Sequence, residues 1–392
     1  MKRNIIFLSL LLLLMILPVV ALYVPTSLPA HSDFSALYNT DLALVHRVPI
    51  YDLEKVEALA VRYADVPADK FFLARFPYPP WYALSTFYLG LMSVKAAATL
   101  WFELNLVMLF LSVWLLTDGW PGRGRLIAFP LGLFFFPVLG GLSVGQYDFP
   151  VLLGTSLLIY SLRKENVVLT VLGSVLLTFK PHIGALILLS GLGWLIVNKS
   201  GFGRRVIRLL IVAGGVLFAA GFIADPAWIV SYPRMLLGYQ KEGNVSACSE
   251  CASLPVWLSR WFLDGSLTNA AWIAMTLLIV LMIVFYMNRS FLKSPELLLS
   301  AALLVTLLVS PYLYNYDFLL LLVPFAVLAS NSHLVQKIVV LLCYLVPIFA
   351  IILYGREGNT SLIIVAVVMT IVLYARMLSM KKPVIDFTGR AA

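Results

Sequence analysis

The chain has 392 residues, of which 61% are hydrophobic and 12% charged, and its mean hydropathy is +0.96. Soluble domains carry about twice that share of charged residues, so the composition excludes a water-soluble domain. The net charge of +9 is what basic loops on the cytosolic side of a membrane supply, and it needs no nucleic-acid partner. The sequence therefore predicts an integral membrane protein.

About twelve transmembrane helices are predicted, because a helix needs roughly 20 apolar residues to cross the bilayer. Several of the apolar runs are short, so those helices must extend into polar flanks, tilt or stop partway. We find no soluble module and no clear internal repeat, and we expect one membrane domain over residues 1–392. The runs are 5–24, 96–117, 126–142, 149–162, 167–179, 183–197, 206–224, 269–287, 295–309, 317–330, 334–354 and 360–378.

The first run, 5–24, has a basic start and an apolar core, as in a signal peptide. It lacks a convincing small-x-small cleavage site, which favours a signal anchor that stays as the first helix. Placing Lys2 and Arg3 in the cytosol also puts the other basic short loops and both termini inside. Two long segments, 25–95 and 225–268, then lie outside. Asp33 follows the first run and sits just beyond the hydrocarbon at the outer face.

The first outer segment is predicted to contain short helices along the membrane surface, because it mixes charges and aromatic residues. Tyr38 to Val48 reads as an amphipathic stretch, and a charged stretch follows from Glu54 to Lys70. Pro79-Pro80 suits the start of a helix. In the second outer segment, Cys248 and Cys251 favour a local disulfide over a zinc or redox site, since no further His or Cys lies nearby.

The short outer turns each hold a polar group, whereas the cytosolic turns are basic and lack such groups. Polar and ionisable residues at helix ends that face a bundle interior are functional candidates. Their concentration on one side predicts an outward-facing cavity. The turns contain Gly145 to Asp148, Lys180 to His182, and Ser310 to Asp317.

Together these pieces resemble glycosyltransferase family 87, the polyprenyl-phosphate-mannose type of the GT-C superfamily. The resemblance implies an all-α, GT-C-type bundle that moves a sugar from a polyprenyl phosphate to an acceptor hydroxyl, with inversion. The chain has Tyr314 and Tyr316-Asp317 where mannosyltransferase members carry Trp and His, so the sugar and the acceptor stay open. The matching residues are His31-Ser32-Asp33-Phe34, Tyr51-Asp52, Phe76 to Pro80, Gly145-Gln146, Lys180-Pro181, Ser310-Pro311 and Tyr316-Asp317-Phe318.

This chemistry needs a carboxylate that deprotonates the incoming hydroxyl, and Asp33 is the candidate base. Its alternative role is a helix cap or a surface acid. Asp317 either orients a substrate hydroxyl as a second catalytic charge or caps its helix. Lys180 either neutralises the lipid phosphate as a point charge or extends to the membrane interface.

Five further residues complete the predicted substrate-binding set. Arg75 is a second candidate for the phosphate, and His182 either assists Lys180 or is an interfacial histidine. Gln146 hydrogen-bonds either the backbone of the bundle or the donor head group. Tyr316 suits stacking against a sugar ring, and Tyr78 either contacts substrate or locks the Pro-Pro corner.

No cofactor is expected, because no metal-ligand cluster and no nucleotide-binding glycine loop is present. A transient divalent ion on Asp33 and Asp317 is left open. The expected partners are a polyprenyl-phosphate sugar, mannose or another hexose or pentose, a glycan or glycolipid acceptor, and membrane lipids. We expect the plasma membrane, the inner membrane of a bacterium, as the location. The alternative function is a transporter or flippase of lipid-linked saccharides.

Overall fold

The computed structural model describes residues 33–63, 75–198, 200–242, 252–263, 266–287, 294–330 and 333–379. Within these ranges every regular element is a helix and none is a strand, which confirms the all-α prediction. The predicted span 5–24, the pair His31-Ser32, and Cys248 and Cys251 lie outside the described residues.

Five described helices are long and apolar enough to cross a membrane, or six if one bent pair counts as a single span. All predicted runs from 96–117 onward fall on helices, but several of those helices are too short to span alone. The five are α5 (Val94–Leu116), α11 (Gly201–Ala224), α14 (Leu267–Met287), α17 (Leu334–Tyr354) and α18 (Thr360–Ser379). The shorter helices are α8 (Asp148–Lys164), α9 (Val167–Leu177), α10 (Pro181–Val197), α15 (Pro295–Val309) and η5 (Asn315–Leu321) continued by α16 (Leu322–Ala329).

The predicted run 126–142 is not one straight helix. It is divided between α6 (Gly122–Leu133) and α7 (Phe136–Val144), which bend by 54° at the break. Proline explains the break, because Pro130 lies inside α6 and Pro137 lies at the start of α7. A proline inside a helix removes a backbone hydrogen bond, whereas a proline at the first turn favours a new start.

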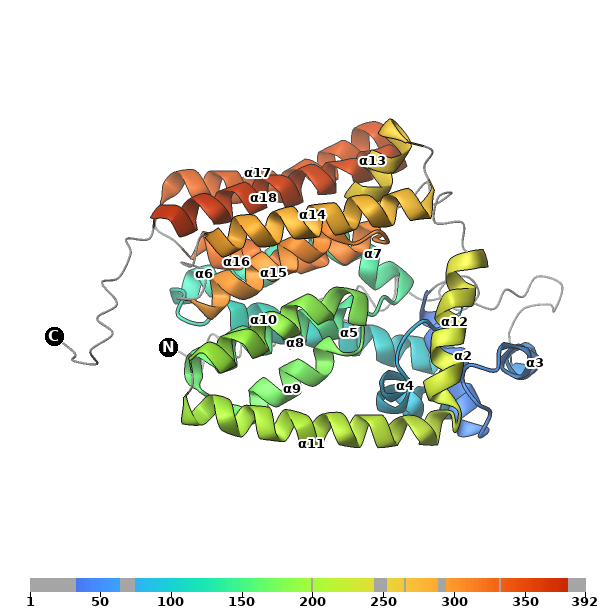
Figure 1. Ribbon diagram of the computed structural model, residues 1–392. Helices are drawn as coiled ribbons and strands as arrows, with labels where there is room; N and C mark the ends of the chain where they lie inside the picture. The colour runs from blue at the N-terminus through green and yellow to red at the C-terminus, as the bar shows by residue number, and fades with distance from the viewer. Residues whose placement is uncertain are drawn as a thin grey trace.

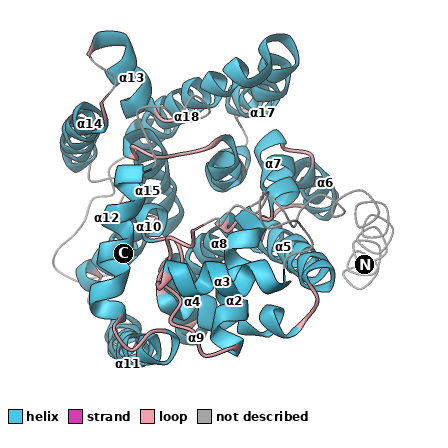
Figure 2. Ribbon diagram, turned by 90° about the vertical axis from the view of Figure 1, so that its right-hand side faces the viewer, coloured by secondary structure: helices cyan, strands magenta, loops and turns pink. Residues whose placement is uncertain are grey.

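Five helices pack together at one end of the bundle, and we call them the cap. Figure 1 shows α2, α4 and α12 gathered at the right-hand end, away from the layer of α14, α17 and α18. Figure 2, viewed from that end, shows α2, α3 and α4 in front of the ends of α5, α8 and α9. The cap consists of α2 (Asp33–Val45), α3 (Leu53–Tyr63), α4 (Pro80–Thr86), η2 (Phe87–Leu91) and α12 (Trp228–Glu242).

Helix α2 differs from the amphipathic surface stretch expected over Tyr38 to Val48. It begins at Asp33 and is buried on every face from Phe34 to Ala43, because η2, α3 and α4 pack around it. Gly90 in η2 permits the closest approach, since a Cβ there would lie 2.4 Å from the carbonyl oxygen of Asp41. The start of α4 is as predicted, with Pro80 at its first position.

The other end of the bundle carries the basic turns. There Arg163, at the end of α8, lies 3.1 Å from Asp118, and Arg376 of α18 donates to the carbonyl of Val327 at 2.7 Å. We call this the basic end. The structure thus separates the polar turns from the basic turns, as the distribution of Lys and Arg predicts.

Candidate active site

A buried ion triad joins three helices at the cap end. The Nζ of Lys180 lies 2.8 Å from Oδ1 of Asp148 and 2.5 Å from Oδ1 of Asp317. All three side chains are at most 4% exposed. Burial opposes the charge of Lys180, but the two carboxylates outweigh it and raise the pKa of the lysine above its usual value. The triad therefore holds a charged lysine at the meeting point of α8, α10 and η5.

Each member of the triad stands at the start of a helix. Asp148 is the first residue of α8, Lys180 precedes Pro181 at the start of α10, and Asp317 lies in the first turn of η5. The second oxygen of Asp317 accepts from the backbone N–H of Tyr314 at 2.6 Å. Asp317 thus ties the beginning of η5 to the lysine, and both its oxygens are occupied by protein groups.

Asp33 lies close to this triad and is only half-buried. Its Oδ2 accepts from Nε2 of Gln146 at 2.8 Å, and its side chain also accepts a hydrogen bond from Tyr316. The hydroxyl of Tyr147 donates to the backbone carbonyl of Asp33. Residues far apart in the sequence thus fix both the backbone and the carboxylate of Asp33.

The orientation of Gln146 follows from its own turn. Its Oε1 accepts from the N–H of Tyr147 at 2.7 Å, which leaves the amide nitrogen to face Asp33. Gly145 adopts a left-handed conformation with φ of 67°, and a Cβ there would lie 2.6 Å from Cβ of Phe34. The indole of Trp101 donates to the carbonyl of Gly145 at 2.8 Å. Only glycine suits this position, and α5 anchors the turn.

The environment of Asp33 raises the pKa of its carboxyl above the usual aspartate value. Burial is the largest cause and raises the pKa, whereas the positive charge of Lys180 and the hydrogen bond from Tyr316 lower it. Asp317 raises it further, and the hydrogen bond from Gln146 lowers it. A carboxylate with a raised pKa is a stronger proton acceptor than an exposed aspartate, which suits a general base.

Aromatic rings surround these polar groups. The ring of Tyr78 packs edge-on against Tyr147 at 4.8 Å between centroids, and the hydroxyl of Tyr51 donates to the carbonyl of Tyr78 at 2.6 Å. Tyr314 stacks on Tyr316 at 5.2 Å, and Lys180 lies 5.8 Å from the centroid of the Tyr316 ring. Tyr78 therefore supports the turn that holds Asp33, and Tyr316 borders both Asp33 and Lys180.

The two remaining predicted residues are Arg75 and His182. Arg75 is half-buried and lies next to α12, where a Cβ on Gly238 would be 4.0 Å from its Nη1. His182 is exposed on the first turn of α10. The structure thus brings together Asp33, Gln146, Lys180, Tyr316 and Asp317, and His182 lies close enough to Lys180 and Asp317 for their charges to act on its imidazole.

Sequence reasoning did not single out Asp148, Tyr147 or Asp41. Asp148 was visible as the acid of the Gly145 to Asp148 turn, directly before an apolar run, which is a position where a carboxylate commonly faces the protein interior. Asp41 is fully buried, and its Oδ1 accepts from the hydroxyl of Thr86 at 3.1 Å. Nothing in the alternation of its neighbours indicated that α2 would be buried on every side. Among the described residues no group of three or more His, Cys, Asp or Glu side chains is placed to hold a metal ion.

Comparison with known proteins identifies one relationship. The family model "Glycosyltransferase family 87" matches residues 76–311, which is more than half of the chain. The matched region contains Tyr78, Gln146, Asp148 and Lys180, whereas Asp33 precedes it and Asp317 follows it. No curated protein and no solved structure matches the chain at a significant level.

Proposed function

Because this chain belongs to glycosyltransferase family 87, we propose that it transfers a sugar from a polyprenyl phosphate to a hydroxyl of a glycan or lipid, with inversion. Family membership and the apolar helices make it a membrane glycosyltransferase. The proposed sugar is mannose or another hexose or pentose. The proposed place of reaction is the outer face of a bacterial plasma membrane, and the concentration of Lys and Arg in the turns at the opposite end of the bundle supports this side for the cap end. The flippase alternative has no observation that favours it over a transferase.

Asp33 is the proposed general base, and its environment carries the proposal. Its carboxyl is half-buried, so a substrate hydroxyl can reach it, and Gln146 and Tyr316 orient it. Asp317 and Asp148 are less suited to this role because both are fully buried and bound to Lys180. Of the acids that meet at this end of the bundle, Asp33 combines access with a raised pKa.

Lys180 and Asp317 are proposed as positioning residues. Two of the three N–H groups of the ammonium are used by Asp148 and Asp317, so one is left for any other partner. Through Asp317 the lysine fixes the start of η5, and Tyr316 of that segment contacts Asp33. Arg75 and His182 are less buried and are the proposed ligands of the departing phosphate.

The proposed reaction is a single displacement. The acceptor hydroxyl gives its proton to the Asp33 carboxylate, and its oxygen forms a bond to the anomeric carbon. The bond between that carbon and the phosphate oxygen breaks at the same time, and the polyprenyl phosphate leaves with the electron pair. Positive charge near the phosphate stabilises it as it departs, and attack opposite the leaving group inverts the anomeric carbon.

The test is replacement of Asp33 by asparagine, which keeps the shape and removes the base. We expect Asp33→Asn to insert into membranes as the wild type does and to lose about 10²- to 10⁴-fold in the transfer of radiolabelled sugar from a synthetic polyprenyl-phosphate donor. Glu57→Gln is the matched control, because Glu57 lies in the same outer segment and is an exposed carboxylate of α3. Full activity in Asp33→Asn would refute the assignment of the base.

A further inference from the structure

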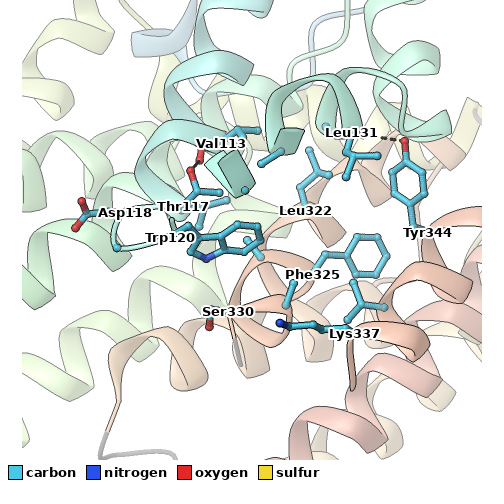
Figure 3. A pocket seen from close by; sticks show the side chains of 18 of the residues that line it. Val113, Thr117, Asp118, Trp120, Leu131, Leu322, Phe325, Ser330, Lys337 and Tyr344 are labelled. Carbon is cyan, nitrogen blue, oxygen red and sulfur yellow. Dashed lines mark hydrogen bonds between the residues drawn. The ribbon is translucent and has the colours of Figure 1, made fainter. Parts of the chain in front are cut away.

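A separate cavity opens at the basic end of the bundle, opposite the cap. It has a volume of about 690 Å³ and lies between α5, α6, α16 and α17. Ligand pockets usually measure roughly 300–1,000 Å³, so this cavity is large enough for a bound molecule. Figure 3 shows Leu131, Leu322 and Phe325 among the apolar side chains of its walls.

The walls of this cavity continue onto the outer surface of the helices. Leu131 of α6 is 47% exposed and Leu341 of α17 is 51% exposed, and both line the cavity. Apolar side chains exposed on a membrane helix contact lipid chains. The hydroxyl of Tyr344 in α17 donates to the carbonyl of Leu131 in α6 at 2.9 Å, so the two helices are joined at this point of the wall (Figure 3). The exposed apolar side chains beside this bond continue the cavity wall onto the surface that faces lipid chains.

The mouth of the cavity carries a surplus positive charge. Asp118 lies 3.1 Å from Arg163 and 3.2 Å from Lys164, and Arg163 also lies 3.8 Å from Glu296, so these acids are already paired. Lys337 lines the cavity from α17 and is exposed, and within the described residues its ammonium makes no ion pair. In Figure 3 the Lys337 side chain extends towards Ser330, with the ring of Trp120 above it.

We propose that this cavity binds one anionic glycerophospholipid, with an acyl chain along the apolar walls formed by α5, α6, α16 and α17 and its phosphate head group at Lys337. An apolar channel alone would accept any lipid chain, and the unmatched lysine at its mouth selects a negative head group. A tryptophan beside a lysine at the ends of membrane helices is the pattern found at the head-group level. The site is distinct from the Asp33 site and does not depend on the proposed reaction.

Native mass spectrometry of the full chain in detergent tests this site. We expect the wild type to retain more phosphatidylglycerol than phosphatidylcholine with the same acyl chains. Lys337→Gln should lower the retention of phosphatidylglycerol about fivefold, the effect of about one basic residue near a charged lipid surface, and leave phosphatidylcholine unchanged. The matched control is Arg205→Gln, because Arg205 is exposed at the start of α11 at the same end and does not line the cavity.

A second variant tests the channel for the acyl chain. Ala326→Leu adds bulk to the α16 wall and should lower the retention of both lipids, with folding checked by circular dichroism and gel filtration. If it does not fold, the Lys337→Gln and control measurements decide the matter. Equal retention of the two lipids by the wild type, or equal behaviour of Lys337→Gln and Arg205→Gln, would overturn the proposal. Displacement of phosphatidylglycerol by inorganic phosphate would assign the site to a free anion. Displacement by a polyprenyl phosphate would assign the site to the donor lipid. Either result would also overturn the proposal.

Discussion

Replacement of Lys180 by glutamine tests the ion triad that holds the active-site segments together. The triad contains two carboxylates and one ammonium, with Lys180 at 2.8 Å from Asp148 and 2.5 Å from Asp317. Lys180→Gln leaves two buried acids without a counter-charge, at the point where α8, α10 and η5 meet. Asp148→Asn instead leaves one lysine and one aspartate, which is a balanced pair.

The expected costs differ because a buried charge without a partner is far more expensive than a weakened hydrogen bond. Removing one member of a buried ion pair costs about 3–5 kcal/mol, a large share of a total stability of roughly 5–15 kcal/mol. For Lys180→Gln we expect a cost in that range. For Asp148→Asn the amide oxygen can still accept from Lys180, and we expect a cost on the order of 1 kcal/mol.

The assay is unfolding in detergent micelles, followed by tryptophan fluorescence, with Lys164→Gln as the control. Lys164 pairs with Asp118 at 3.2 Å, but its side chain is 51% exposed, and an exposed pair contributes about 1 kcal/mol or less. Lys180→Gln should therefore be the least stable of the three variants. The charge argument is wrong if Lys180→Gln has the same free energy of unfolding as Lys164→Gln. It is also wrong if Asp148→Asn lowers the free energy of unfolding as much as Lys180→Gln does.

Two further predictions concern the turn that holds Asp33. Gly145→Ala forces a side chain into the left-handed region and against Phe34, so we expect at least a tenfold loss of transfer activity. The control is Gly193→Ala, which should have no effect because a Cβ there meets nothing within 4 Å. Equal activities of the two variants would contradict the packing argument. Transfer requires an ionised Asp33, and the pKa of this carboxyl is raised. As the pH decreases, the rate should therefore begin to fall at a pH above the usual pKa of an aspartate. Gln146→Leu removes a hydrogen bond that lowers this pKa, so it should move the acid limb of the pH profile of kcat to higher pH. A shift of this limb to lower pH, or no shift, would show that the limb does not reflect the ionisation of Asp33.

The sequence predicts the helices of this protein better than it predicts which helices and side chains contact one another. Apolar runs locate the helices from α5 onward, and Pro79-Pro80 marks the start of α4. The loop charges separate the polar end from the basic end, so the gathering of Asp33 and Lys180 at one end follows from topology alone. The outward-facing cavity at that end stays a prediction.

The pairing of side chains was beyond sequence reasoning because the contacts join distant residues. Gln146 and Asp33 are 113 positions apart, and Lys180 and Asp317 are 137 apart. A helix that is apolar all round carries no periodicity that shows which face meets which neighbour. For the same reason the sequence predicts Lys180 as a phosphate ligand or an interfacial lysine and gives no sign of its contact with Asp148.

Helix position gives a physical reason for the surplus of acids around this lysine. Asp33, Asp148 and Asp317 each lie in the first turn of a helix, where the unpaired N–H groups carry a partial positive charge of roughly half a unit. This charge stabilises a carboxylate and disfavours the ammonium of Lys180, which also stands at a helix start. A single buried carboxylate would have to compensate the cost of burying the ammonium and its repulsion from the positive end of the helix. Two carboxylates compensate both and keep the lysine charged. An acid in the first turn of an apolar helix that begins at the polar end of the bundle is therefore a sequence signal for a residue that faces the site, and it would have identified Asp148. Glu296 in the first turn of α15 shows why the end matters, since it lies at the basic end, 3.8 Å from Arg163.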